Sequence, residues 1–114
     1  MSVLIVAVNA KSEVEPLVWH DYEYFDRYLP PGYCLNFTRK PYAVSVHIDT
    51  LSPSGYKVDV TIYVSSKLKW SGQLGAGESS PTITCNDQYT EVHIGNPNGN
   101  PEVHITGYID WVMH

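Results

Sequence analysis

The chain has 114 residues, with seven Lys and Arg against twelve Asp and Glu, so its formal net charge is −5. This length predicts a single domain spanning residues 1–114. Seven cations do not make a nucleic-acid surface or favour an anionic membrane. An aromatic content of 12% with only 17% charged residues excludes a disordered tail.

The first apolar run, Val3–Val8, has the composition of a strand and ends at the polar Asn9. It lacks a basic n-region and a clear cleavage site, so we interpret it as a buried strand and not as a signal peptide. No run approaches the roughly 20 apolar residues of a membrane-spanning helix. We expect cytoplasmic synthesis without a classical signal peptide, and later release to an extracellular location stays open.

Period-two alternation, and not a helical period, dominates the rest of the chain. The valine and isoleucine residues of 42–50 and of 56–65 fall on one face of each run, and the turn cluster 51–55 separates the runs. These two runs are predicted to form a hairpin. Further strands are expected at Leu17–Phe25, at Tyr33–Thr38, around Gly72, and at Thr82–Cys85, Tyr89–Gly95 and Glu102–Val112. About eight short strands with regular turn signals predict an all-β antiparallel β-sandwich, of the jelly-roll or another Greek-key type.

The last two predicted strands flank Asn98-Gly99, a dipeptide that strongly favours a type I′ hairpin turn. A turn centred there places His93 opposite His104. The alternation then directs one set of side chains into the core: Val92, Ile94, Val103, Ile105, Ile109 and Trp111. The other set faces outward and forms a candidate ligand-binding surface of Tyr89, Glu91, His93, His104, Tyr108 and Asp110. Such a face can stack on a sugar ring and hydrogen-bond its hydroxyl groups.

An aromatic stretch in the first third of the chain is denser than a small core requires. It includes Trp19, Tyr22 and Tyr24, followed by Phe25 and Tyr28. One interpretation is an exposed recognition surface, which makes the first three residues candidate ligand contacts. The other is a small core packed under the Pro30-Pro31 loop.

Metal and catalytic chemistry have weaker support. A transition-metal site is suggested by His93 and His104 together with Glu91. Zinc sites show three or four clear ligands, so we favour an ordinary pair of solvated histidine side chains on the sheet surface. Asn and Asp residues late in the chain suit calcium, yet they are also ordinary turn residues. We therefore expect no cofactor, with calcium as the alternative.

No nucleophile motif surrounds Cys34, so we expect no enzymatic activity. Cys34 and Cys85 lack metal-ligand spacing and are expected to be free thiols, with a disulfide after release as the alternative.

The composition resembles that of small soluble β-sandwich lectins, which are acidic, poor in lysine and rich in Tyr, Trp, Asn and Gly. This resemblance implies a carbohydrate-binding homo-oligomer that gains avidity from several shallow sites. The leading hypothesis is thus a non-enzymatic, lectin-like protein whose partners are glycans. The alternatives are a membrane-binding or pore-forming sandwich, with exposed aromatic rings at the lipid headgroups, and a structural subunit of an assembly.

Overall fold

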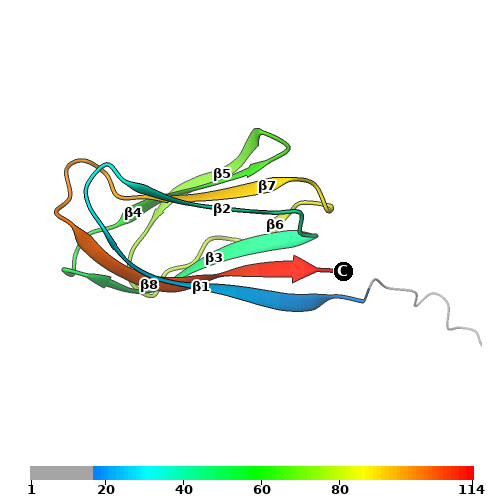
Figure 1. Cartoon of the computed structure of the whole chain (residues 1–114), viewed down its shortest axis with the longest axis horizontal. Helices are drawn as coiled ribbons and strands as arrows, with labels where there is room; N and C mark the ends of the chain where they lie inside the picture. The colour runs from blue at the N-terminus through cyan, green and yellow to red at the C-terminus, as the bar shows by residue number, and fades with distance from the viewer. Residues whose placement is uncertain (1–16) are drawn as a thin grey trace, which may run out of the picture.

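The computed structural model describes residues 17–114, so the strand predicted at Val3–Val8 lies outside the described residues. Every regular element in 17–114 is a β-strand, and the strands form two antiparallel four-stranded sheets that pack face to face (Figure 1). The strands are β1 (Trp19–Leu29), β2 (Cys34–Arg39), β3 (Ala43–Ser52), β4 (Val58–Val64), β5 (Lys67–Leu74), β6 (Ile83–Thr84), β7 (Thr90–Gly95) and β8 (Val103–Met113). The predicted all-β sandwich is confirmed.

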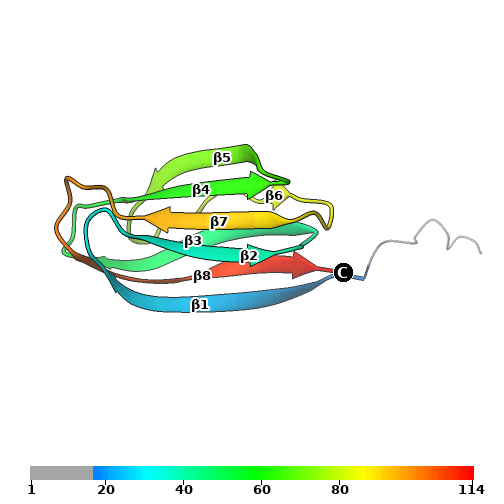
Figure 2. The same ribbon diagram turned by 45° about the horizontal axis from the view of Figure 1, so that its top comes forward.

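The strand order is β1-β8-β3-β6 in one sheet, called the β1 sheet, and β2-β7-β4-β5 in the other, called the β2 sheet. Only the β4–β5 connection stays within a sheet, and every other connection crosses to the opposite sheet (Figure 2). Eight strands in two packed sheets with such crossovers form a jelly roll.

The core contains the inward members of the alternating runs, which the pleat of each strand directs between the two sheets. The predicted inward set of β7 and β8 is fully buried, and the apolar side chains of β3 and β4 are buried beside it. Trp111 is the largest of these buried side chains. Its indole Nε1–H donates a hydrogen bond of 2.9 Å to Glu23 Oε1, so the polar atom of this buried ring has a partner.

The predicted hairpin between runs 42–50 and 56–65 is wrong. β3 pairs with β8 and β6, whereas β4 pairs with β5 and β7 in the other sheet. The hairpin partner of β4 is β5, and the connecting residues Ser65 and Ser66 have φ values of 51° and 66°. Positive φ at both central residues is the type I′ geometry, but two serines do not signal it in a sequence.

The predicted hairpin across Asn98-Gly99 is also wrong. β7 pairs with β2 and β4, and β8 pairs with β1 and β3, so this loop crosses between sheets. Neither Asn98 nor Gly99 adopts a positive φ. Asn96 holds this end of the sandwich together, because its buried side-chain amide donates to the carbonyl oxygens of Leu29 and Pro101, both at 2.9 Å.

One side of the sandwich, between edge strands β1 and β2, is closed by charged side chains. Arg39 of β2 forms ion pairs with Asp21 and Glu23 of β1, and its guanidinium lies 5.7 Å from the centroid of the Trp111 ring. Inward-pointing charges at a sheet edge discourage pairing with another strand. In the described residues, no helix is long and apolar enough to cross a membrane.

Candidate functional site

The outer surface of the β1 sheet gathers most of the candidate ligand-binding side chains. Phe25 and Leu29 of β1 are buried, so the alternate residues of this strand face away from the core. β8 and β3 contribute their outward residues beside them in register. We call this surface the tyrosine face and define it as Tyr22, Tyr24, Tyr28, Tyr108, His20, His47, His104, Asp26, Asp49 and Asp110.

Aromatic rings form a continuous cluster across the three strands of the tyrosine face. The Tyr108 ring of β8 lies 5.4 Å from Tyr22 in an edge-to-face arrangement and 5.6 Å from Tyr24, both centroid distances. The His47 ring of β3 stacks on the other side of Tyr108 at 4.6 Å. Because Tyr24 is 71% exposed and Tyr22 is 46% exposed, the cluster offers ring surface to a partner.

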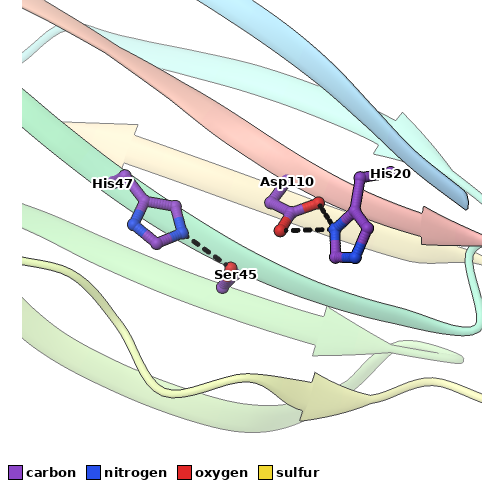
Figure 3. A network of polar contacts seen from close by, with 4 residues as sticks. All are labelled: His20, Ser45, His47 and Asp110. Atoms are coloured by element: carbon purple, nitrogen blue, oxygen red, sulfur yellow. Dashed lines mark hydrogen bonds and ion pairs between the residues drawn. The ribbon is translucent and has the colours of Figure 1, made fainter.

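Hydrogen bonds hold the histidines at one end of this cluster (Figure 3). His20 Nδ1–H donates to the carboxylate of Asp110, at 2.8 and 2.9 Å from its two oxygens. His47 Nε2 is hydrogen-bonded to Ser45 Oγ at 2.9 Å. His47 Nδ1 is hydrogen-bonded to Ser79 Oγ, which the figure does not draw, at 2.7 Å. Both ring nitrogens of His47 thus have partners within the protein, which fixes the ring in its stacked position beside Tyr108.

A second aromatic and acidic group lies at the other end of β1. Tyr28, which is 69% exposed, stacks on the His104 ring with centroids 4.4 Å apart. His104 Nε2 lies 2.5 Å from Asp26 Oδ1. The two groups give the tyrosine face an ordered set of rings and carboxylates along the length of β1.

The charged side chains of the tyrosine face are acidic. The outward positions of β1, β8 and β3 include three aspartates but no Lys or Arg. Partial burial raises the pKa of the Tyr108 phenol above its ordinary value, and the negative charge of Asp49 raises it further, with smaller effects of Tyr22 and Asp110. A surface with this potential repels anions and attracts cations.

The structure brings together five of the residues predicted to bind ligand, namely Tyr22, Tyr24, His104, Tyr108 and Asp110. Trp19 lies at the start of β1, on the alternate side of the strand, and is 54% exposed.

The other three predicted residues do not join the tyrosine face. Glu91 and His93 lie on the outer surface of the β2 sheet, where His93 Nε2 is 3.1 Å from Glu91 Oε1 and its ring is near Tyr63. Tyr89 precedes β7 in the same sheet. The predicted pairing of His93 with His104 is therefore wrong, because these strands belong to opposite sheets. Within residues 17–114, no group of three or more His, Cys, Asp or Glu side chains is arranged to hold a metal ion.

Half of the tyrosine face was not among the predicted ligand contacts, although Tyr28 belonged to the aromatic stretch: His20, Asp26, Tyr28, His47 and Asp49. The signal for three of them was available, because strict alternation through β1 places His20, Asp26 and Tyr28 on the side of Tyr22 and Tyr24. His47 and Asp49 could not be found in this way. Their position depends on β3 lying next to β8, and Asp49 is the extra residue where the register shifts between Ile48 and Thr50.

Both cysteines are free thiols; Cys34 is exposed and Cys85 is buried. Burial raises the pKa of each thiol above its ordinary value. The Asn and Asp residues considered for calcium have structural roles: Asn86 and Asp87 adopt positive φ in a turn, and Asn96 and Asn100 hydrogen-bond the neighbouring loops.

No protein-family model matches the sequence, and the comparison with curated proteins gives no match. Among solved structures, the chain is similar to a chain of the Bacillus endospore appendages, described as a novel family of disulfide-linked pili. The two share 12% sequence identity, and the alignment covers 99% of this chain and 100% of that one with a TM-score of 0.51. At this identity the likeness concerns the fold, and it extends over both chains from end to end.

Proposed function

We propose that this protein is a structural subunit that associates with further copies of itself into an oligomer or filament. The observation that carries the proposal is the end-to-end match of its fold with a chain from pili. The match covers 99% of this chain and 100% of that one, so it concerns the fold of the sandwich as a whole and not one part of it. We also propose that the protein acts outside the cell, either on the cell surface or released from it.

The surface of the described residues supports self-association. Tyr22, Tyr24, Tyr28 and Tyr33 are all exposed, together with Leu68. Exposed tyrosines and apolar side chains are enriched where proteins contact one another. A repeating subunit needs such contact surfaces, whereas an isolated monomer does not.

Disulfides cannot by themselves connect this chain into a polymer. The whole sequence has two cysteines, and Cys85 is buried. A folded copy with one accessible thiol, on Cys34, forms one intermolecular disulfide, which yields a dimer. We therefore propose that the contacts between copies are non-covalent, in contrast to the disulfide-linked pili that share the fold.

The test is to purify the full 114-residue chain and measure its mass by light scattering over a wide concentration range, with electron microscopy of the same samples. We expect assemblies that grow with concentration and persist in a reducing agent. A monomer at every concentration, with and without reductant, would overturn the proposal. Loss of the assemblies in reductant alone would overturn its non-covalent part.

The carbohydrate-binding hypothesis stays a prediction, since no comparison concerns a glycan. It would use the same tyrosine face as a stacking platform. A glycan array probed with the full chain and with Tyr24→Ala separates carbohydrate binding from self-association. Saccharide binding by the wild type that is lost in the variant would favour the lectin-like hypothesis.

A further inference from the structure

Two separate surfaces of residues 17–114 carry charges of opposite sign. The basic side chains of these residues are absent from the tyrosine face, but two of them lie close together where β5 begins, directly after the Ser65-Ser66 turn. We call Lys67, Leu68 and Lys69 the lysine tip. All three side chains are exposed, and Leu68 is 55% exposed despite being apolar. Neither lysine forms an ion pair with an acidic side chain of residues 17–114.

The lysine tip is held in a defined conformation. The backbone N–H of Ser65 donates to the carbonyl oxygen of Tyr89 at 2.8 Å, and the Ser65 hydroxyl donates to Gln88 Oε1. Lys69 is the extra residue of a bulge where the β4–β5 register shifts between Ile62 and Tyr63. Because this hairpin end is already ordered, docking it costs little conformational entropy.

The lysine tip and the tyrosine face cannot meet within one copy. β5 is an edge of the β2 sheet, whereas β1, β8 and β3 form the opposite layer (Figures 1 and 2). The tyrosine face points outward from that layer, away from the β2 sheet. Any contact between the two surfaces must therefore join different copies.

We propose that the lysine tip of one copy docks on the tyrosine face of the next. This inference rests on the proposed function and names the surfaces that it would use. The ammonium groups of Lys67 and Lys69 find exposed tyrosine rings for cation–π contact and the carboxylates of Asp26, Asp49 and Asp110 for charge pairing. Leu68 lies between the two lysines in the sequence and adds an exposed apolar side chain, which leaves the strand on the side opposite to Lys67.

This contact joins two different surfaces, so it is heterologous. Each copy keeps a free tip at one end and a free face at the other, and such an arrangement extends to a ring or an open filament. An isologous contact would stop at a dimer. The geometry of one lysine tip and one tyrosine face per copy therefore suits a subunit that polymerises.

The test uses charge reversal in the full chain. The tip variant is Lys67→Glu/Lys69→Glu, and the face variant is Asp26→Lys/Asp49→Lys. In each variant alone, the tip and the tyrosine face carry charges of the same sign and repel each other. We therefore expect the critical concentration for assembly to rise at least about tenfold. Lys40→Glu/Lys57→Glu changes the net charge as much as the tip variant does and serves as the control, expected to assemble like the wild type. Thermal melting shows that each variant is folded.

Mixing the variants gives the decisive result. In an equimolar mixture, the acidic tip of the tip variant can dock on the basic tyrosine face of the face variant. The basic tip of the face variant can likewise dock on the acidic tyrosine face of the tip variant, so we expect the two variants to assemble together. Rising NaCl should weaken the wild-type assembly, because salt screens exposed charges.

If the tip variant assembles like the wild type, the docking is wrong but the proposed function stands. The same holds if the wild type assembles and the mixture of variants does not. A wild-type chain that is monomeric throughout would overturn both.

Discussion

Gly107 of β8 lies so close to His47 of β3 that a Cβ carbon on Gly107 would fall 2.1 Å from the His47 carbonyl oxygen. The same carbon would lie 2.9 Å from Cζ of Phe25, on the other neighbouring strand. Three strands of the β1 sheet thus meet at a position where only glycine fits.

We expect Gly107→Ala to destabilise the fold by about 1–3 kcal/mol or more, because the added methyl group meets backbone that has little room to move. Denaturant unfolding measures the change. Gly99→Ala is the matched control: nothing lies within 4 Å of its added carbon and its φ is not positive, so its effect should stay within about 0.5 kcal/mol. Equal stability of the two variants would contradict the close approach.

Asn96 and Asn98 lie in the same loop and have the same side chain, but their surroundings differ. The buried amide of Asn96 bonds two carbonyl oxygens, whereas Asn98 is exposed. We expect Asn96→Ala to lower the free energy of unfolding by about 1–3 kcal/mol, since the carbonyl groups of buried Leu29 and of Pro101 lose their donor. Asn98→Ala should change it little, and a reversed order of the two losses in denaturant melts would refute this role of Asn96.

Glu23 accepts a hydrogen bond from the buried Trp111 indole. Its removal in Glu23→Ala leaves that N–H without its partner and frees Arg39 from one of its two acidic neighbours, so we expect a loss of about 1–3 kcal/mol. Glu102→Ala, which removes an exposed carboxylate from the loop before β8, is the control. An unfolding midpoint for Glu23→Ala equal to that of the control would show that water replaces the carboxylate.

The two thiols should react at different rates with a thiol reagent. We expect one rapid equivalent per folded chain, from exposed Cys34, and a second only after unfolding, from buried Cys85. Two equally fast equivalents in the folded protein would contradict the burial of Cys85. Cys34→Ala should abolish the rapid equivalent alone.

The raised pKa of Cys85 also predicts a direction for the pH dependence of stability. A thiol with a higher pKa in the folded than in the unfolded state stabilises the fold fully below its unfolded value of about 8.5, and this contribution is lost as the pH rises toward the folded value. We expect the free energy of unfolding to fall above about pH 8.5, and to fall less steeply in Cys85→Ala. A steeper fall in the variant would reverse the sign.

The sequence by itself determined which side chains of each strand lie inside. Val92, Ile94, Val103 and Ile105 are buried as the alternation predicted, because the pleat directs neighbouring side chains to opposite faces whatever strand lies alongside. The same rule placed Tyr108 and Asp110 outside. Fold class followed from counting such runs and the turn signals between them.

Only the tertiary structure decided which strands are neighbours, and hence which outward residues share a surface. His93 and His104 are eleven residues apart and both point outward, yet they lie on opposite faces of the sandwich because the loop through Asn98 crosses between sheets. Pairing depends on the burial of both sheets against each other, a property of the whole chain that no local turn signal contains. His20 and Asp110, ninety residues apart, consequently form a hydrogen bond that the sequence does not show.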